Sequence, residues 1–113
     1  MMPRVLDIFD IGALQAQASR ATALLGAMCN EKRLMILCQL VDGERSVNEL
    51  AELLDAAQPT VSQHLALLRR QGLVAARQEG QAHLYSLAGD EAREILRTLQ
   101  SLYCDPRPKE PRQ

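Results

Sequence analysis

Apolar residues recur at helical intervals over much of the chain, and this spacing predicts a series of short helices. The first such run extends from Ile11 to Met28. A second helix is expected to begin after Asn30, a residue type that favours helix N-termini, and to end at Asp42-Gly43. Its apolar stripe consists of Leu34, Leu37, Cys38 and Val41. The pattern therefore places Cys38 on the buried side of this helix.

A capping box predicts the start of a third helix. Ser46 precedes Glu49 by three residues, so the hydroxyl and the carboxylate can each accept a hydrogen bond from an otherwise unpaired N–H group of the first turn. This helix is expected to run to about Leu54, and residues 55–57 then turn the chain.

A fourth helix is predicted over residues 58–71. Pro59 fits only in the first turn, where its missing N–H group costs no hydrogen bond, and Gly72 can adopt the left-handed conformation that ends a helix. The inward side of this helix is predicted to consist of Val61, Leu65 and Leu68. Two short helices joined by a tight turn form a helix-turn-helix, whose second helix enters the major groove of DNA.

Two strands and one more helix complete the predicted domain. Residues 73–77 and 82–87 have the composition of short strands around a hairpin tip at Glu79-Gly80. Asp90 can cap a final helix. The apolar stripe of that helix consists of Ala92, Ile95, Leu99, Leu102 and Tyr103. The predicted fold is therefore mainly α with a β-hairpin, a winged helix-turn-helix of order α-α-α-α-β-β-α.

The folded domain is expected to span residues 11–104. Residues 1–10 are interpreted as a flexible arm, and residues 105–113 as a disordered tail because they combine three prolines with five charged residues. With 113 residues, of which 3% are aromatic, the chain can build only a modest core of aliphatic side chains. Small helical domains often complete such a core by dimerising. Residues 11–104 are therefore expected to form a dimer, in addition to binding DNA through the helix-turn-helix.

The charge distribution favours a DNA-binding protein although the net charge is only −1. The acidic excess lies within residues 1–57. Residues 58–89 contain the cations Arg69, Arg70 and Arg77, the single acidic residue Glu79, and the histidines His64 and His83. The predicted DNA-binding face therefore carries the basic excess, and its affinity for DNA should be moderate and strongly salt-dependent.

The candidate DNA contacts form two groups. The first lies early in the fourth helix, where polar side chains can bond base edges, and consists of Gln58, Thr60, Ser62, Gln63 and His64. The second suits phosphates or the minor groove and consists of Arg69, Arg70, Arg77, Gln81 and His83. An ordinary solvated surface is the alternative for any single member. A hydrogen bond within the domain is an equally good interpretation of His64, and plain surface exposure of His83.

These segments resemble the ArsR/SmtB family of bacterial repressors. The resemblance rests on residues 29–37 (C-N-E-K-R-L-M-I-L), residues 46–54, Val61-Ser62-Gln63-His64-Leu65, Leu68-Arg69 and Gly72-Leu73-Val74. It covers about residues 20–104 and implies a homodimer whose first and last helices form the interface. One departure is Ala57, where relatives often have a serine that caps the recognition helix. Losing such a cap typically costs about 1 kcal/mol, and Gln58 is the candidate to replace it.

The metal-sensing members of that family differ from this chain at their ligand positions. The arsenic, lead and cadmium sensors have a C-V-C-D-L type motif in the third helix, whereas residues 46–50 here are S-V-N-E-L. The zinc and nickel sensors use Asp and His pairs on the last helix, and no histidine follows Leu84 here. The histidines and cysteines of this chain also lack ligand spacing. Neither a metal nor another cofactor is therefore expected, and a metal-responsive repressor with atypical ligands is kept as an alternative.

Cys38 and Cys104 resemble the thiol pair of the redox- and persulfide-responsive branch of the family. That branch includes biofilm-growth repressors, sulfide-responsive repressors and haemolysin regulators. The resemblance implies that the two thiols couple within one protomer on oxidation or persulfidation and thereby change DNA binding. Cys104, close to Arg107 and Lys109, is expected to react first, and Cys38 to resolve it. Unreactive packing is the alternative for both thiols, and a structural role is the interpretation of Cys29.

The sequence therefore predicts a dimeric repressor that binds an inverted-repeat operator in double-stranded DNA and responds to reactive sulfur or an oxidant. A winged-helix adaptor that binds protein instead of DNA is the alternative from another class. No enzyme activity is expected, because no nucleophile–base pair, phosphate loop or carboxylate pair is recognisable. Without a secretion signal or an apolar run of about 18 residues, the chain is expected in the cytoplasm and outside the membrane.

Overall fold

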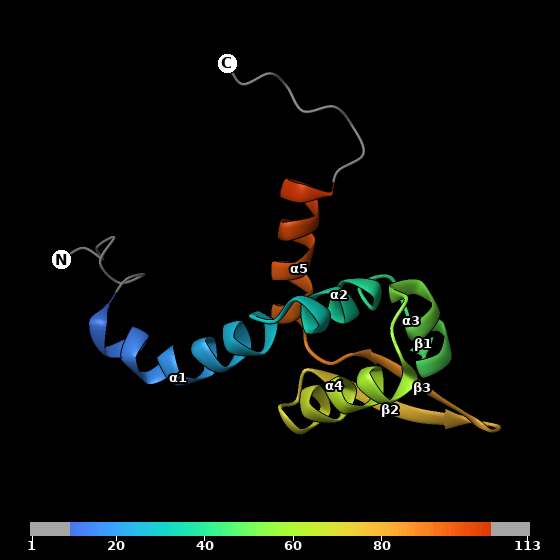
Figure 1. Cartoon of the computed structure of the whole chain (residues 1–113). Helices are drawn as coiled ribbons and strands as arrows, with labels where there is room; N and C mark the ends of the chain where they lie inside the picture. The colour runs from blue at the N-terminus through green and yellow to red at the C-terminus, as the bar shows by residue number, and fades with distance from the viewer. Residues whose placement is uncertain (1–9, 105–113) are drawn as a thin grey trace, which may run out of the picture.

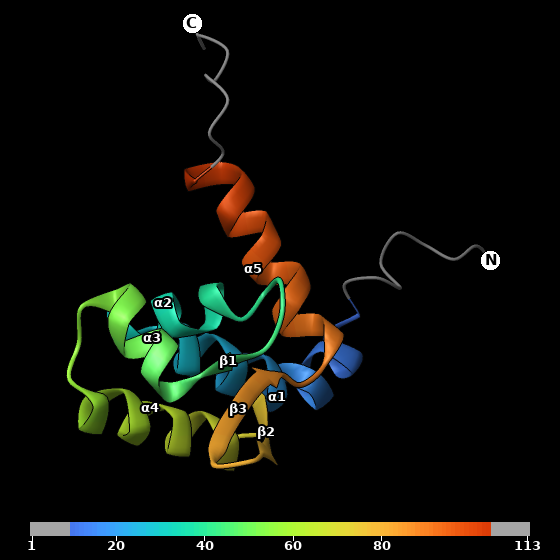
Figure 2. The same ribbon diagram turned by 90° about the vertical axis from the view of Figure 1, so that its right-hand side faces the viewer.

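The computed structural model describes residues 10–104, which form five helices and one small antiparallel sheet (Figure 1). In chain order the elements are α1 (Ile11–Met28), α2 (Glu31–Gln39), β1 (Arg45–Ser46), α3 (Val47–Leu54), α4 (Gln58–Arg70), β2 (Val74–Glu79), β3 (Ala82–Leu87) and α5 (Asp90–Tyr103). Helix α4 and the β2–β3 hairpin lie on one side of the molecule, and α5 extends from the opposite side (Figure 1, Figure 2). The architecture is the predicted winged helix-turn-helix.

Side-chain caps define where three of the helices begin. Asp10 and Asn30 each accept a hydrogen bond from a backbone N–H group in the first turn of α1 and α2. At α3 the predicted capping box is complete. The Ser46 hydroxyl accepts from the Glu49 N–H at 3.1 Å, and the Ser46 N–H donates to the Glu49 carboxylate at 2.8 Å. The helix starts predicted at Asn30 and Ser46 are therefore confirmed.

One apolar core lies between the helices and the sheet. Its fully buried large side chains are Ile36, Leu37, Leu40, Val41, Leu50, Val61, Leu65, Leu68 and Leu96. They come from α2 and the turn after it, α3, α4 and α5. The long α1 buries only Ala27 and Met28, at its C-terminal end. Most of its apolar residues are exposed, including Ile11 at 64% and Leu14 at 56%.

The sheet has three antiparallel strands in the order β1-β3-β2. Strands β2 and β3 pair from Val74 opposite Leu87 to Glu79 opposite Ala82. The hairpin tip is therefore Gly80-Gln81, one residue later than predicted. Gly80 has a φ of 62°, in the left-handed region that a two-residue hairpin turn of this kind requires.

Strand β1 is absent from the sequence-based prediction. Its residues Arg45 and Ser46 pair with Tyr85 and Leu84 of β3. A strand of two residues has no alternating pattern to detect, so only its pairing with a distant part of the chain defines it. The observed order is thus α-α-β-α-α-β-β-α rather than α-α-α-α-β-β-α.

Helix α2 ends at Gln39, earlier than the predicted Asp42-Gly43. The Leu40 N–H bonds to the Leu37 carbonyl at 3.0 Å, and the Val41 N–H bonds to the Cys38 carbonyl at 3.3 Å. Bonds to the residue three positions back give this turn the tighter 3₁₀ pattern. Leu40 and Val41 reach the core from the turn, whereas Cys38 is only half-buried. The prediction that Cys38 lies on a buried stripe is therefore only partly correct.

Three arginines donate to backbone carbonyls where helices end. Arg33 and Arg45 bind carbonyls at the ends of α1 and α2, at 2.8 and 3.0 Å. Arg93 of α5 binds the carbonyl of Val41, in the turn after α2. A cation is favourable at such places because the last carbonyls of a helix have no partner within it. These three charges therefore stabilise the fold.

Residues 1–9 and 105–113 lie outside the described part of the chain, and with them the predicted arm and tail as well as Arg107 and Lys109. Only Asp10 of the predicted arm is described, as the cap of α1. Within residues 10–104 no helix combines the length and the hydrophobicity that crossing a membrane requires.

Candidate nucleic-acid interface and thiol pair

Helix α4 has a buried and an exposed side. As predicted, the buried side consists of Val61, Leu65 and Leu68. Ser62 and Gln63 are exposed, and Thr60 is half-buried. These hydroxyl and amide groups lie in the first half of the helix, which is the part that meets base edges when such a helix enters the major groove.

The N-terminus of α4 has no side-chain cap. Ala57 is at the N-cap position with an extended backbone (φ −71°, ψ 141°), and no side chain bonds to the first turn. Gln58 instead donates to the amide oxygen of Asn48 in α3. The prediction that Gln58 replaces the missing cap is therefore wrong, because its side chain joins the two helices of the helix-turn-helix.

Arg69 and Arg70 are exposed in the last turn of α4. Within residues 10–104 neither guanidinium group forms an ion pair or a side-chain hydrogen bond. Both charges are therefore available to an anionic ligand at the point where α4 leads into the β2–β3 hairpin, which is the wing of the fold.

Arg77, on β2, is held by carboxylates. Its Nε donates to Glu44 at 2.7 Å, and its Nη2 donates to Glu44 at 2.9 Å and to Glu79 at 3.2 Å. The hydrogen bond from Arg77 is the main cause that lowers the pKa of the Glu44 carboxyl. The predicted phosphate contact therefore already has an intramolecular partner. Sequence reasoning missed Glu44, because the short strand that brings it near β2 was not predicted.

The remaining wing candidates lie at the hairpin tip. Gln81 is the second residue of the tip, and His83 lies opposite Gln78, whose side-chain amide donates to the Gly80 carbonyl at 3.2 Å. Both Gln81 and His83 are exposed. They are therefore accessible to a ligand that contacts the end of the wing.

His64 is half-buried on α4, near α2. Burial lowers the pKa of its imidazole below 6.5, and the positive charges of Arg33 and Lys32 lower it further. Among residues 10–104 no hydrogen bond holds the imidazole, so the interpretation of His64 as a structural hydrogen-bonding residue finds no support.

Cys38 on α2 and Cys104 at the end of α5 are linked through the backbone contacts of Gln100. Cys104 is exposed and directly follows α5. Gln100, one turn earlier, donates its side-chain amide to the Cys38 carbonyl at 3.4 Å, and its own carbonyl accepts from the Cys104 N–H at 2.8 Å. Burial raises the pKa of the Cys38 thiol, and the charge of the Cys104 thiolate raises it further.

Cys29 is exposed in the turn after α1, where its N–H bonds to the Gly26 carbonyl at 3.1 Å. Within residues 10–104 its side chain is exposed, so packing in the core of a single chain does not account for the structural role predicted for Cys29.

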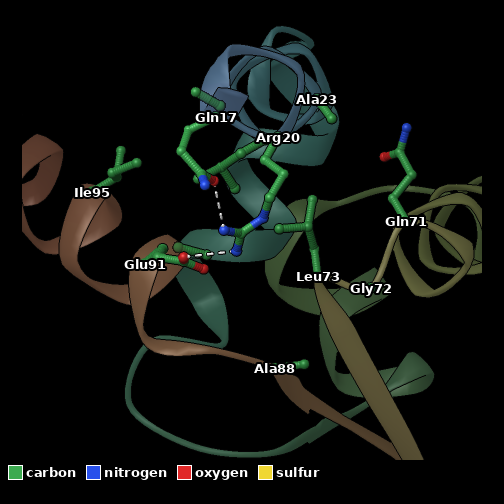
Figure 3. A pocket seen from close by; sticks show the side chains of 12 residues that line it. Gln17, Arg20, Ala23, Gln71, Gly72, Leu73, Ala88, Glu91 and Ile95 are labelled. Carbon is green, nitrogen blue, oxygen red and sulfur yellow. Dashed lines mark hydrogen bonds and ion pairs between the residues drawn. The ribbon is translucent and has the colours of Figure 1, made fainter. Parts of the chain in front are cut away.

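A cavity of about 570 Å³ lies between α1, the turn from α4 to β2 and the start of α5 (Figure 3). Arg20 projects into it and binds the Gln17 side chain and the Glu91 carboxylate, both at 3.0 Å. Most of the other side chains that line it are small or apolar. Within residues 10–104 no three potential metal ligands converge, in this cavity or elsewhere.

Comparisons with known proteins lead to regulators of transcription. A family model described as "Bacterial regulatory protein, arsR family" matches residues 30–76. The chain is 46% identical over 95 residues to the transcriptional activator HlyU of Vibrio cholerae serotype O1, covering 84% of this chain and 88% of that protein. It is 38% identical over 107 residues to the biofilm growth-associated repressor of Agrobacterium fabrum, covering 93% and 92%.

Solved structures share the fold. Reduced HlyU from Vibrio cholerae N16961 matches with a TM-score of 0.80 at 45% identity, over 82% of this chain and 98% of that one. Mb0332 from Mycobacterium bovis, described as a homodimeric winged helix-turn-helix DNA-binding domain, matches with a TM-score of 0.69 at 32% identity, over 78% and 82%. The similarity therefore extends over most of each chain.

Proposed function

The chain belongs to the ArsR family of bacterial transcriptional regulators, and from this premise we propose that it is a homodimeric repressor switched by its own thiols. In the reduced state the dimer binds an inverted-repeat operator. A bond between Cys38 and Cys104 changes that affinity. The observation that carries the proposal is the hydrogen bond from Gln100, one turn before Cys104, to the Cys38 carbonyl, because it places the end of α5 against α2.

The proposed DNA-binding surface combines α4 with the wing, which lie on the same side of the molecule (Figure 2). Ser62 and Gln63 contact base edges, and Arg69 and Arg70 neutralise phosphates. The other contacts in this proposal come from Gln58, Thr60, His64, Arg77, Gln81 and His83. Arg69 and Arg70 make the binding salt-dependent, because each neutralised phosphate releases counterions.

The proposed dimer explains the exposed apolar face of α1. Ile11, Leu14 and Leu25 are each more than half exposed, at 64%, 56% and 55%. Their spacing places them on one side of the helix. A partner copy would cover this face, as in the homodimeric description of Mb0332. A two-fold dimer presents two copies of α4, which suits half-sites about 34 Å apart and hence an inverted repeat.

The proposed chemistry begins at Cys104, since it is exposed whereas Cys38 has a raised pKa. With a hydropersulfide, the Cys104 thiolate attacks the outer sulfur, becomes a persulfide and releases the thiolate of the donor. With peroxide it becomes a sulfenic acid and releases hydroxide. In either case the Cys38 thiolate then attacks the Cys104 sulfur, and hydrosulfide or hydroxide leaves as the disulfide forms. The two thiols together lose two electrons and two protons to the oxidant.

Closure of this bond would join the end of α5 to α2. Helix α2 packs in the same core as α4, through side chains such as Ile36, Leu37 and Leu65. A shift of α5, which contributes to the proposed interface, would change the separation of the two copies of α4. Because that separation must match the DNA helix, a small shift weakens operator binding.

The test treats the reduced protein with polysulfide or peroxide, maps crosslinks by mass spectrometry and measures operator binding by fluorescence anisotropy at several salt concentrations. The wild type should form the Cys38–Cys104 bond and change its affinity. Cys38→Ser should bind DNA but not respond, whereas the matched control Cys29→Ser should behave like the wild type. Closure of the bond should also accelerate as the pH rises toward 9.0, because the raised pKa of Cys38 limits its thiolate.

Three other results would contradict the proposal. An unchanged affinity after complete crosslinking would remove the thiol switch. A change of affinity on metal titration that needs neither thiol would favour a metal-responsive repressor. The absence of salt-sensitive DNA binding would instead favour a winged-helix adaptor for proteins.

A further inference from the structure

We infer that Glu44 sets the strength of DNA binding by competing with a DNA phosphate for the wing residue Arg77. The inference rests on the proposed DNA-binding function and adds a residue that lies outside the predicted contacts. Glu44 belongs to the turn before β1, and Arg77 belongs to β2.

The sheet brings these two residues together. Strand β3 lies between β1 and β2, and its Tyr85 is the partner of both Arg45 and Ala76. Arg45, Tyr85 and Ala76 thus form one row across the sheet. Glu44 directly precedes Arg45 in the chain, and Arg77 directly follows Ala76. Because side chains alternate along a strand, Arg77 projects from the face opposite to Tyr85, and there the Glu44 carboxylate reaches it across β3.

The contact occupies the part of Arg77 that a phosphate would use. Nε and Nη2 of Arg77 donate in parallel to the two oxygens of the Glu44 carboxylate, at 2.7 and 2.9 Å. An arginine binds a phosphate with the same pair of donors and the same geometry. Glu44 and a phosphate therefore exclude each other from this side of the guanidinium group.

The net charge of the wing depends on whether Arg77 binds Glu44 or a DNA phosphate. Arg77 is the only Arg or Lys of residues 74–87. It faces two carboxylates, Glu44 and Glu79, so that one positive charge is set against two negative charges. While the contact persists, this cluster therefore repels DNA rather than attracting it.

The contact is nevertheless open to competition. The Arg77 side chain is 53% exposed and the Glu44 side chain 35% exposed. Ion pairs between solvated groups contribute little net stability, because water solvates both charges when they separate. A phosphate placed beside the wing by α4 can thus displace Glu44, and part of the binding free energy is spent in opening the pair.

A second interpretation predicts the opposite sign. If Glu44 acts only by fixing the wing in the orientation that DNA needs, its loss should weaken binding. If Glu44 competes with a phosphate, loss of its carboxylate should increase the affinity for DNA. This increase should occur only when Arg77 is present.

The experiment compares operator binding by the reduced full-length protein, Glu44→Gln, Arg77→Gln and the double variant. The operator for these measurements is a DNA segment upstream of the gene that encodes the protein. A footprinting assay identifies it as the segment that the protein protects. Glu44→Gln should bind about 3- to 10-fold more tightly and steepen the salt slope by up to about 0.9, as one more phosphate contact predicts. In the Arg77→Gln background the same substitution should change the affinity less than about 2-fold.

Matched controls separate competition from general charge effects. Asp42→Asn removes the same charge from an exposed position of the turn that carries Glu44, where no contact with Arg77 forms, and should change the affinity less than about 2-fold. Thermal melts should show all variants folded, because Glu44 and Arg77 lie at the surface.

Weaker binding by Glu44→Gln would overturn the inference in favour of a positioning role. An equal gain with and without Arg77 would overturn it in favour of simple repulsion between Glu44 and DNA. If no form of the protein shows salt-sensitive DNA binding, the proposed function itself fails, and this inference fails with it.

Discussion

At the scale of single residues, the partners of the arginines decide what the surface can bind. Arg33, Arg45 and Arg93 donate to carbonyls where helices end, and Arg77 donates to carboxylates. On the proposed DNA-binding surface, Arg69 and Arg70 keep their charges unpaired within residues 10–104. Fewer positive charges on this face are therefore free to contact DNA than its number of arginines suggests.

The environment of His64 predicts how the stability of the protein depends on pH. Its pKa in the folded state is lowered below 6.5, first by burial and then by Arg33 and Lys32, so the unfolded state binds a proton more readily. The free energy of unfolding should therefore decrease as the pH falls through 6.5 and level off below the folded-state pKa. Urea unfolding at several pH values between about 7.5 and 5 measures this change.

The variant His64→Gln should lose this part of the pH dependence, whereas His83→Gln, at an exposed position of the wing, should retain it. If the two variants and the wild type show the same pH profile, the environment of His64 does not penalise its cation.

At the scale of elements, α4 depends on packing more than on its own ends. Its buried side holds it in the core through Val61, Leu65 and Leu68, while its N-terminus lacks a cap. Helix α3 shows the reverse, because its capping box is complete although Leu50 is its single fully buried residue within the described chain. Helix α5 also begins without a side-chain cap, because Asp90, predicted as its cap, is the first residue of the helix and Gly89 is at the N-cap position. The start of the recognition helix can thus still be improved.

Ala57→Ser should stabilise the protein by about 1 kcal/mol, because a serine hydroxyl at an N-cap accepts from an N–H group that is otherwise unpaired. The extended backbone of residue 57 already has the geometry of an N-cap. Chemical denaturation measures the gain. As a control, Ala66→Ser in the middle of α4 should be neutral or slightly destabilising. A gain no larger than that of the control would mean that the hydroxyl does not reach the first turn.

At the scale of the whole molecule, α1 is the element that the single chain does not explain. It is the longest helix of the described chain, it extends away from the rest of the domain, and it buries only its last two residues (Figure 1). An exposed apolar face of this kind is typical of an interface. The α1 face therefore supports the proposed dimer more directly than any other surface of the described chain.

Leu14→Glu should shift the protein from a dimer toward the 12.5 kDa monomer, because a carboxylate in an apolar interface loses its hydration. Analytical ultracentrifugation measures the shift, and operator affinity should fall in parallel because only one copy of α4 then contacts DNA. Ala16→Glu, on the opposite side of α1, is the matched control and should remain dimeric. A dimeric Leu14→Glu would place the interface elsewhere.

Local chemistry in the sequence was sufficient to predict most of the elements. Asn30 and Ser46 cap helices, Pro59 and Gly72 delimit α4, and the composition of two short segments around a glycine predicts the hairpin, all from residues close in the sequence. Such signals are visible because the residues that interact lie within a few positions of one another. Errors remained at the ends of elements, as in the 3₁₀ turn after α2, where packing competes with helix propensity.

The partners of the charged side chains and the contacts of α5 were decided by the tertiary structure. Glu44 and Arg77 are 33 positions apart and meet only because β3 lies between their strands. Gln100 reaches the carbonyl of Cys38 across 62 positions because α5 packs against α2. The sequence by itself thus determined that this chain forms a winged helix-turn-helix with a recognition helix. Which of its charges remain for DNA, and which helix contacts the Cys38 carbonyl, depended on contacts between distant segments that no local pattern encodes.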